Sequence, residues 1–389
     1  MGICGIVMGM AHLTLGILAD SKKKDEFRLP IHPDHIARIP AELRARITVE
    51  SGYGARFGET DARLAELVGA VAPRSEVIAA SDIVLLPKPV LADLADLREG
   101  QILWGWPHVV QDREFTQVAI DKRLTLIAWE AMNRWTPSGE FAVHVFHLNN
   151  EIAGYASVLH ALTLTGSTGH YGRPLTSVVL GFGNTARGAI VALQALGVHD
   201  ITVLTMRDVG AVASPIASAP LKHLYRTEVD STGTTVQTES GRVSAAAFLA
   251  QHDIVVNCVL QDTDNPLMFV SGAEIADFTP GSLIVDVSCD AGMAFDFARP
   301  TSFADPMFTV GEGVSYYAVD HSPSFLWNSA TWVISEALLP YLPTVMGGPK
   351  EWEAERTIAQ AIEIRDGSVV NPRILSFQDR AAEFPHELQ

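Results

Sequence analysis

A glycine-rich turn between an apolar strand and a helix constrains the fold of this chain more than any other feature. The apolar run Ser177–Leu180 leads into Gly181–Ala186, which reads GFGNTA and fits the pattern G-x-G-x-x-A. A helical stretch follows, and then a second apolar run, Ile201–Thr205. A strand, a helix and a strand of about 30 residues in this order predict a parallel sheet with a dinucleotide-binding turn. On the pattern alone, an ordinary glycine turn is the alternative.

The small residues of this turn each have a physical reason. Gly181 permits the tight turn, Gly183 lets the backbone approach a pyrophosphate, and Ala186 lets the helix pack closely on the strand. The phosphates then bind at the helix N-terminus, where backbone N–H groups lack partners within the helix. The cofactor contacts predicted here are Gly181, Phe182, Gly183, Asn184, Thr185 and Ala186.

The end of the second strand indicates which dinucleotide binds. NAD enzymes carry an acidic residue there, about 20 residues after the glycines, and it binds the ribose 2′-hydroxyl. In this chain Thr205 takes that place, and Met206, Arg207 and Asp208 follow. A hydroxyl or a guanidinium can bind a 2′-phosphate that a carboxylate would repel. The pattern therefore favours NADP(H), with Thr205 and Arg207 as contacts; if Asp208 points inward instead of Arg207, NAD(H) is favoured.

A further alternation of strands and helices precedes this unit. Apolar runs bounded by turn residues predict the strands, and periodic segments between them predict the helices. The predicted strands are Leu13–Ala19, Arg46–Glu50, Ile83–Pro87, Gln101–Trp104 and Thr125–Ala128, and the predicted helices are His35–Ala45, Asp61–Leu67 and Asp112–Asp121. In the second half, strands are predicted at Ile254–Asn257, Leu283–Val287 and Phe308–Val310. The pattern is typical of an α/β fold with parallel sheets covered on both faces.

Several polar residues follow these strands directly. Lys88, His108 and Glu130 come after three of the strands in the first half of the chain. Parallel sheets bind ligands beyond the carboxyl ends of their strands, so we expect the three side chains to converge. A lysine there suits a carboxylate or a carbonyl oxygen, and a histidine can exchange a proton near neutral pH. In the second half, Asp290 lies just past a strand and is a better candidate than Asp286, which lies within it. Each residue taken alone could equally be a solvated loop residue.

The length of 389 residues suggests two or more domains. Long helices are expected at Glu151–Leu164, capped by Asn149 or Asn150, and at Ser324–Tyr341. We therefore predict a discontinuous substrate domain, residues 1–150 with 322–389, around a dinucleotide-binding domain, residues 151–321. The charged tail from Lys350 is expected to pack on the outside.

Composition excludes several classes of protein. A net charge of −17 argues against a nucleic-acid-binding surface and against an anionic membrane as partner. Three cysteines are too few for a disulfide framework and lack zinc-ligand spacing, so we predict no metal site and a cytoplasmic location. Residues 1–12 are interpreted as a leader or a misplaced start. A signal peptide is the alternative, although no positive charge precedes the apolar run.

The order of several short motifs resembles the alanine dehydrogenase and pyridine nucleotide transhydrogenase superfamily over about residues 13–345. The motifs are Phe27–Pro30 (FRLP), Glu50–Gly54 (ESGYG), Leu86–Pro89 (LPKP), Trp106–His108 (WPH), Glu151–Gly154 (EIAG) and Asp286–Asp290 (DVSCD). No single motif is decisive, but their order and spacing together are specific. The resemblance implies two Rossmann-like domains joined by long helices around a cleft, and a homo-oligomer.

The resemblance also implies roles for individual residues. Arg28 and Lys88 would bind the carboxylate and carbonyl of the substrate, His108 would be the general acid and base, and Asp290 would lie beside the nicotinamide ribose and the reacting amine. Glu130 and His321 are further candidates for substrate binding. The remaining expected cofactor contacts are Asn150, Asn257, Val259, Leu260 and Val287.

Two departures from the alanine dehydrogenase pattern favour another branch of the superfamily. Ala291–Met293 replaces the usual Gln-Gly-Gly segment, and Thr205 replaces the acidic residue. Ala318–Pro323 and Ser335–Pro340 look more like the NADP(H)-dependent N5-(carboxyethyl)ornithine synthases. The resemblance implies reductive condensation of a pyruvate-like 2-oxo acid with an amino group of an ornithine-like or lysine-like amino acid. The alternatives are alanine dehydrogenase activity, saccharopine dehydrogenase-like activity and a catalytically silent NADP(H)-binding protein.

Overall fold

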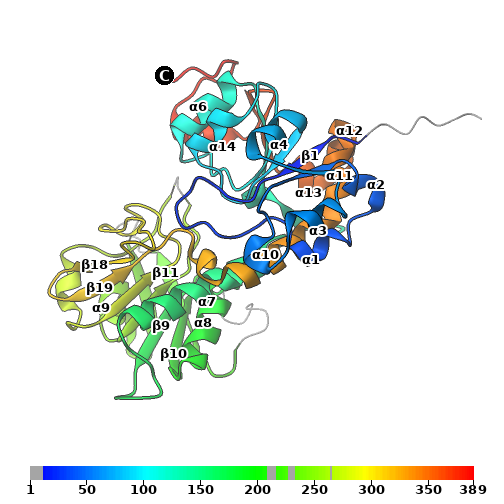
Figure 1. Cartoon of the computed structure of the whole chain (residues 1–389). Coiled ribbons are helices and arrows are strands. Elements are labelled where there is room, and N and C mark those ends of the chain that lie inside the picture. The colour runs from blue at the N-terminus through cyan, green and yellow to red at the C-terminus, as the bar shows by residue number, and fades with distance from the viewer. Residues whose placement is uncertain (1–11, 208–215, 227–232, 263–264) are drawn as a thin grey trace, which may run out of the picture. The chain divides into compact units, whose positions relative to one another are not determined.

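The computed structural model describes residues 12–207, 216–226, 233–262 and 265–389 (Figure 1). Contacts between Cα atoms divide the chain into two compact units. Unit 1 combines the chain up to Phe146 with Trp327–Gln389, and unit 2 is His147–Leu326. The division at residue 146 coincides with the start of a helix, whereas the predicted boundary after residue 150 falls inside that helix. The expected leader falls almost wholly, and Asp208 wholly, outside the described residues.

Unit 1 is built on an eight-stranded sheet in the order β21-β20-β6-β5-β4-β1-β2-β3. Its six parallel strands are β1 (Leu15–Ile17), β2 (Ile47–Glu50), β3 (Ala70–Ala72), β4 (Ile83–Leu85), β5 (Ile102–Gly105) and β6 (Thr125–Ala128), and two antiparallel strands, β20 (Ile362–Arg365) and β21 (Ser368–Val369), complete the edge beside β6. Strands β1 and β4–β6 are buried throughout. All five strands predicted for this half are present, with ends that differ by a few residues from the prediction. Strands of a parallel sheet are buried on both faces, so their sequences appear as short apolar runs.

Helices of unit 1 cover this sheet. They are α1 (Pro33–Ile36), α2 (Ala41–Arg44), α3 (Asp61–Ala65), α4 (Arg74–Ala80), α5 (Leu91–Asp96), α6 (Arg113–Asp121), α10 (Trp327–Leu338), α11 (Leu342–Gly347), α12 (Pro349–Ala354), α13 (Arg356–Ala359) and α14 (Pro372–Gln378). The single helix predicted over His35–Ala45 is wrong. Pro40 separates α1 from α2, because proline removes a helical N–H and disfavours helical geometry in the residue before it.

The tail from Lys350 does not simply pack on the outside, as we predicted from its charge. Strand β20 pairs with β6, where Ile362 lies opposite Ile127 and Ile364 opposite Leu126. Both isoleucines are buried in the cores of unit 1. Their alternation with Glu363 and Arg365 is a strand pattern hidden within a charged segment.

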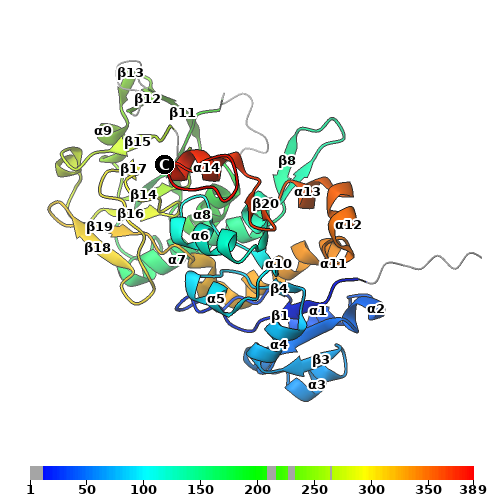
Figure 2. The same ribbon diagram turned by 90° about the horizontal axis from the view of Figure 1, so that it is seen from above.

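Unit 2 is built on a nine-stranded sheet in the order β13-β12-β11-β10-β9-β14-β16-β19-β18. Its strands are β9 (Thr176–Leu180), β10 (Asp200–Thr205), β11 (Leu221–Arg226), β12 (Thr234–Thr238), β13 (Gly241–Ser244), β14 (Ile254–Asn257), β16 (Leu283–Asp286), β18 (Met307–Val310) and β19 (Val314–Tyr317). Figure 2 shows β11–β13 at one end of this sheet and β18–β19 at the other. Strands β11–β13 were not predicted, because their sequences carry too many polar residues to read as apolar runs. Strand β19, with the sequence VSYY, was missed although three of its four residues are buried.

Two helices of unit 2, α7 (His147–Leu164) and α8 (Asn184–Ala195), pack side by side (Figure 1). Their backbones approach closely at two glycines: a Cβ on Gly154 would lie 1.9 Å from the carbonyl oxygen of Thr185, and one on Gly188 would lie 1.8 Å from that of Glu151. The predicted caps Asn149 and Asn150 are wrong, since α7 begins at His147. The helix predicted over Ser324–Tyr341 is divided into a 3-10 turn, α10 and a second 3-10 turn.

Both sheets reverse their strand order at their first strand. In unit 1, β1 lies between β4 and β2; in unit 2, β9 lies between β14 and β10. A crevice forms beyond the carboxyl ends of the strands at such a point, where the connections leave on opposite sides. Among the described residues, no helix is long and apolar enough to cross a membrane.

Candidate active site

Three polar side chains meet at the carboxyl edge of the unit 1 sheet. Strands β4, β5 and β6 are parallel neighbours, with Leu85 opposite Trp104 and Trp104 opposite Ile127. The loops after them carry Lys88, His108 and Glu130. Lys88 Nζ lies 3.3 Å from His108 Nε2, and the backbone N–H of His108 donates to Glu130 Oε1 at 2.7 Å. The structure therefore brings these three candidates together.

His108 is held in an unusual backbone conformation. Its φ of +49° lies in the left-handed region, which a residue other than glycine seldom adopts. The hydrogen bond to Glu130 fixes this backbone, and the N–H of Trp106 donates to the carbonyl of Pro87 at 2.8 Å. The ring is half exposed, and its Nδ1 lies 3.8 Å from Glu130 Oε1. The loop thus presents one ring nitrogen to Lys88 and keeps the imidazole accessible for proton exchange.

A second carboxylate lies behind Glu130. Glu363 on β20 is buried, and its Oε1 accepts a hydrogen bond from Asn371 Nδ2 at 3.1 Å. Glu130 Oε2 and Glu363 Oε2 are both buried and have no hydrogen-bond partner among the residues that the structure describes. Burial raises the pKa of both carboxyls, and the charge of Glu363 raises that of Glu130 further. The sequence had offered Glu130 as a substrate contact; in the structure it holds the His108 loop.

Arg28 is buried in the loop after β1. Its Nε donates to Glu26 Oε1 at 2.8 Å and its Nη2 to Glu26 Oε2 at 2.5 Å. The guanidinium lies 5.1 Å from the centre of the Trp106 ring. Glu26 was not identified from the sequence, because nothing in the pattern distinguishes it from neighbouring charges. The loop that carries Arg28 is therefore the neighbour of the loop that carries Lys88. Binding of a substrate carboxylate by Arg28 stays a prediction.

The glycine turn of unit 2 has the geometry that a pyrophosphate needs. Gly181 has a φ of +91°, and a Cβ there would lie 3.2 Å from the carbonyl oxygen of Cys258. Gly183 caps helix α8, and a Cβ there would meet no described atom within 4 Å. Open space therefore adjoins the N–H groups of the first turn of α8. Ala186 is fully buried against the sheet, and Phe182 is buried beneath the guanidinium of Arg187. These residues fit a dinucleotide.

A buried network shapes the loops after β14 and β16. Asp286 is inaccessible to solvent and accepts hydrogen bonds from Asn257 Nδ2 at 2.9 Å, from the N–H of Cys289 at 3.0 Å and from the Tyr316 hydroxyl. Burial raises the pKa of Asp286 to about 6, against the opposing effect of the Tyr316 hydrogen bond. Asp286 therefore has a structural role here, and the partly exposed Asp290 lies four residues further along the loop.

The other predicted cofactor contacts lie along the same edge of unit 2. Ser288 Oγ donates to the carbonyl of Val259 at 2.7 Å and so joins the two loops, while Leu260 is 92% exposed. Thr205 ends β10 and accepts a hydrogen bond from the N–H of Arg207 at 3.1 Å. The Arg207 side chain is exposed. The remaining two contacts, Val287 after β16 and Asn150 in the first turn of α7, are partly buried.

His321, a predicted substrate contact, is buried within unit 2. Its Nδ1 lies 2.6 Å from Asp320 Oδ1, and its ring contacts Phe303 edge-on at 4.9 Å between ring centres. These contacts account for its burial, and its role toward a substrate remains a prediction.

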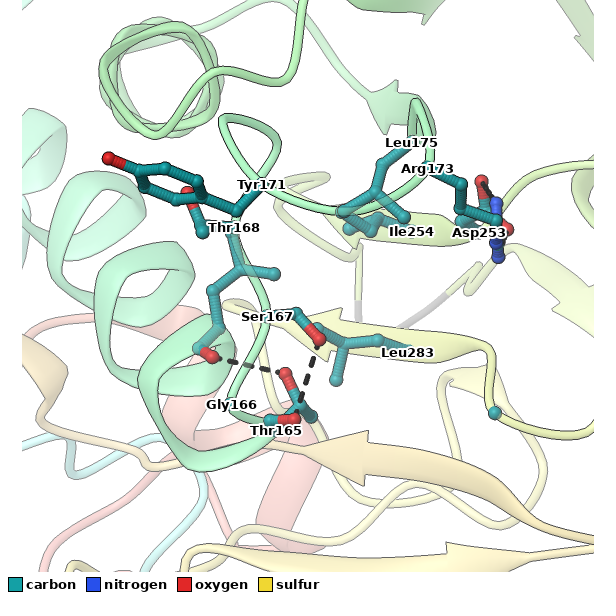
Figure 3. A pocket seen from close by; sticks show the side chains of 12 residues that line it. Thr165, Gly166, Ser167, Thr168, Tyr171, Arg173, Leu175, Asp253, Ile254 and Leu283 are labelled. Carbon is teal, nitrogen blue, oxygen red and sulfur yellow. Dashed lines mark hydrogen bonds and ion pairs between the residues drawn. The ribbon is translucent and has the colours of Figure 1, made fainter.

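A separate pocket of unit 2 lies at the opposite edge of the sheet (Figure 3). Leu175, Asp253 and Gly281 line it, and they precede β9, β14 and β16. Arg173 at its rim is paired with Asp253 through two contacts of 2.9 and 2.5 Å. Because this is the amino edge of the strands, the pocket is not the cofactor site.

Fold and site define the class of protein: a two-unit α/β protein with a dinucleotide-binding glycine turn. The model of the alanine dehydrogenase/PNT N-terminal domain matches residues 16–153, and that of the C-terminal domain matches residues 162–372. The chain belongs to this alanine dehydrogenase/PNT family. The predicted family, fold class and enzyme class are therefore confirmed.

Relatives of two kinds are similar to the chain. An alanine dehydrogenase of Mycobacterium tuberculosis is 25% identical over 93% of this chain and 96% of its own length. An N(5)-(carboxyethyl)ornithine synthase of Clostridium botulinum is also 25% identical, over 80% of this chain and 91% of its own. The two identities are equal, so they do not distinguish between the two activities.

Solved structures share the fold. An L-alanine dehydrogenase superposes with a TM-score of 0.73 at 21% identity, covering 94% of this chain and 99% of that one. A transhydrogenase from Sinorhizobium meliloti gives 0.66 at 18% identity, covering 92% and 99%.

Proposed function

We propose that this protein condenses a pyruvate-like 2-oxo acid with an amino group of an ornithine-like or lysine-like amino acid and reduces the resulting imine with NADPH. Carbonyl oxygen leaves as water when the C=N bond forms, and hydride with one proton converts the imine to a secondary amine. NADPH is oxidised to NADP⁺, the imine is reduced, and water is the other product, so the reaction balances without a further reagent.

The contact between Lys88 and His108 carries this proposal. The two groups lie 3.3 Å apart beyond adjacent parallel strands, where an oxo acid can reach both. Lys88 offers a charge-assisted hydrogen bond to the carboxylate or carbonyl of the substrate. His108 can give a proton to the carbonyl oxygen as the amine adds, and it can help that oxygen leave as water. Glu130 keeps the imidazole in place by binding its backbone.

The cofactor choice rests on the end of β10. Thr205 stands where a carboxylate would repel a 2′-phosphate, and the exposed Arg207 follows it. Gly181–Ala186 would hold the pyrophosphate, and a bound nicotinamide would supply the hydride. These features support NADP(H) over NAD(H).

The choice of the condensing reaction over simple amination is supported by two features of the sequence. Asp290 is followed by Ala291–Met293 instead of Gln-Gly-Gly, and Thr205 replaces the acidic residue after the second Rossmann strand. Alanine dehydrogenases among the relatives support the second candidate, in which ammonia replaces the amino acid.

Cofactor oxidation with a panel of substrates tests the proposal. NADPH and NADH are each mixed with pyruvate or 2-oxoglutarate, with ammonia, ornithine, lysine or no amine. We expect NADPH oxidation only when pyruvate and a diamino acid are both present. Turnover with ammonia alone would instead indicate an alanine dehydrogenase, and turnover with 2-oxoglutarate and lysine would indicate saccharopine-type chemistry. No turnover with any combination would contradict all three.

Substitution of Arg207 tests the cofactor choice separately. Arg207→Ala is expected to lower kcat/KM for NADPH by about tenfold, since one charge-assisted hydrogen bond contributes about 1.5 kcal/mol or more. The value for NADH should not change. Met206→Ala, at the exposed neighbouring position, is the matched control. An equal loss with both cofactors would contradict a role in binding the 2′-phosphate.

A further inference from the structure

A buried carboxylate follows the Lys88 loop, at the start of the next helix. Asp93 lies in the first turn of α5 and is 2% exposed. Its Oδ2 accepts the backbone N–H of Val90 at 2.9 Å, which closes the turn between Lys88 and the helix. A carboxylate that is removed from water needs hydrogen bonds or an opposite charge, since its desolvation is otherwise costly. The other partners of Asp93 therefore show which parts of the chain depend on it.

The loop after β1 supplies two further contacts. The backbone N–H of Lys22 lies 3.2 Å from Asp93 Oδ1 and 3.3 Å from Oδ2, and Ser21 Oγ lies 3.4 Å from Oδ2. Ser21 Oγ also donates a short hydrogen bond to the carbonyl of Lys88. The loop after β1 is thus joined to both ends of the segment that runs from Lys88 to Asp93.

Arg74 supplies the positive charge opposite Asp93. It is the first residue of α4, and its Nη2 donates to Asp93 Oδ1 at 2.7 Å. Its Nη1 donates to the carbonyl of Asp20 at 2.7 Å and lies 3.4 Å from Glu50 Oε2. That Glu50 oxygen accepts the N–H of Ala19 at 2.7 Å. The side chains of Asp93 and Arg74 are 3% and 21% exposed, so water weakens this pairing far less than it weakens a pair of surface charges.

These contacts affect Lys88 because its backbone has little other freedom. Lys88 lies between Pro87 and Pro89. Proline fixes its own φ and limits the conformation of the residue before it, so this segment moves as one piece. The N–H of Trp106 holds one side through the carbonyl of Pro87, at 2.8 Å, and Ser21 holds the other side through the carbonyl of Lys88. The point from which the Lys88 side chain extends is therefore set by the loop after β1.

We propose that Asp93 is a positioning residue for Lys88: it fixes the Lys88 loop to the loop after β1 and so keeps Nζ at the place where the oxo acid binds. Asp93 does not contact the substrate, and it acts through Ser21 and the backbone. A carboxylate suits this role because it accepts several N–H groups at once while it pairs with Arg74. This inference rests on the proposed function and adds to its site a residue that none of the sequence motifs includes.

Asp93→Asn tests the proposal, because the amide keeps the size of the side chain but loses the charge and one acceptor oxygen. We expect KM for pyruvate to rise about tenfold, since Lys88 is displaced from its charge-assisted hydrogen bond to the oxo acid. KM for NADPH and for the amino acid should stay unchanged. An unchanged KM for pyruvate, or an equal rise for NADPH, would overturn the proposal.

Asp96→Asn is the matched control for this substitution. Asp96 lies on the same helix and contacts the same two cations, Lys22 Nζ at 2.7 Å and Arg74 Nε at 3.5 Å. Its side chain is 36% exposed, and exposed ion pairs contribute little. KM for pyruvate should therefore stay at the wild-type value in Asp96→Asn. An equal rise in both variants would mean that any loss of charge on α5 has this effect, and it would contradict a particular role for Asp93.

Ser21→Ala is a milder variant for the case in which Asp93→Asn does not fold. It removes only the hydroxyl that reaches the carbonyl of Lys88. KM for pyruvate should rise about threefold to tenfold, the usual effect of one hydrogen bond. No rise in Ser21→Ala would contradict the coupling between the two loops.

A double-mutant cycle separates positioning of Lys88 from a general loss of stability. Pyruvate is titrated calorimetrically in the presence of NADP⁺, which cannot reduce it, into wild type, Asp93→Asn, Lys88→Ala and the double variant. We expect Asp93→Asn to weaken binding about tenfold when Lys88 is present and by less than about twofold in Lys88→Ala. The same loss in both backgrounds would show that Asp93 does not act through Lys88.

The same titration separates this proposal from the proposed function. Pyruvate binding that depends on Asp93, in a protein without turnover with any amine, would support the positioning role and contradict the function. Turnover with pyruvate and a diamino acid that does not depend on Asp93 would support the function and contradict the positioning role. Absence of both binding and turnover would contradict both.

Discussion

The two units solve the same topological problem with different chemistry. Each has a parallel sheet whose strand order reverses at its first strand, β1 in unit 1 and β9 in unit 2. At the unit 1 reversal the loops after β1 and β4 carry the ionisable side chains of Arg28 and Lys88, and His108 follows the neighbouring strand β5. At the unit 2 reversal, the glycine turn offers backbone groups and open space. The same topology therefore provides a crevice in both units. The residues of the loops determine whether that crevice presents ionisable side chains or backbone N–H groups that can bind an anion.

The largest expected effect is on the side-chain chemistry of unit 1. Lys88→Ala and His108→Ala should each lower kcat by about 10²–10⁴-fold, the usual contribution of a positioned proton-transfer group. NADPH affinity, measured by fluorescence titration, should stay unchanged, because the glycine turn belongs to the other unit. The exposed Lys350 and His199 provide matched alanine controls. Full turnover in both variants would contradict a catalytic role for the carboxyl edge of the unit 1 sheet.

The close approach of α7 and α8 gives the next effect, on stability. Gly188→Ala should destabilise unit 2 by about 1–3 kcal/mol, because its Cβ would lie 1.8 Å from a backbone oxygen that cannot easily move. The measurement is the urea midpoint of unfolding, with Gly58→Ala in unit 1 as a comparison: a Cβ there meets open space but a positive φ. A Gly188→Ala midpoint equal to that of wild type would show that the helices separate at little cost.

Gly183 offers the reverse test within the same turn. Gly183→Ala places a Cβ in open space and at a φ of −94°, so the fold should keep its stability. The methyl would occupy the approach to the helix N-terminus, and the dissociation constant for NADPH should rise by about tenfold. Isothermal titration measures this change. If Gly183→Ala leaves the affinity for NADPH unchanged while Gly188→Ala lowers stability, the glycine turn has only a structural role. The proposed contrast between side-chain chemistry in unit 1 and backbone anion binding in unit 2 would then be wrong.

The smallest expected effect concerns pH and the Glu130–Glu363 pair. Burial raises the pKa of Glu363 above its unfolded value, so the folded state binds more protons over the interval between the two. Stability from this group is complete below the ordinary glutamate pKa and is lost as pH rises through the raised one. In wild type the free energy of unfolding should therefore fall between pH 5 and 8. In Glu363→Gln this fall should be smaller by about 1–2 kcal/mol.

Urea unfolding of wild type and Glu363→Gln across that pH range measures the effect. Glu353→Gln, exposed on α12, is the control and should follow the wild-type curve. A Glu363→Gln curve with the full wild-type slope would show that Glu363 is not the titrating group.

The sequence predicted most of what depends on local pattern. The glycine turn lies at the predicted place between β9 and α8, and Lys88, His108 and Glu130 converge because their strands are adjacent and parallel. The pattern of apolar runs was clear enough to predict that the loops after these strands lie at one edge of the sheet, without knowledge of tertiary contacts. Whether the residues perform the predicted roles is still to be tested.

Residues that depend on distant pairing could not be predicted. Glu363 reaches Glu130 only because β20 adds to the far side of β6, more than two hundred residues away in sequence. Glu26 and Asp93 are single charges, and only the folded backbone shows that one neutralises Arg28 and the other joins two loops. Pro40 was visible in the sequence, yet helical periodicity was given more weight than its backbone restriction.

The antiparallel strand β20 has a consequence for the order in which the protein is made. Synthesis proceeds from the N-terminus, so unit 2 is complete once Leu326 has been added, while unit 1 still lacks Trp327–Gln389. Until then β6 lacks its neighbour β20 and forms an edge of the sheet. Unit 2 therefore has its whole sequence at a stage when the sheet of unit 1 still lacks strands β20 and β21. An exposed strand edge of this kind is a site for wrong pairing between nascent chains, which the last segment of the chain removes.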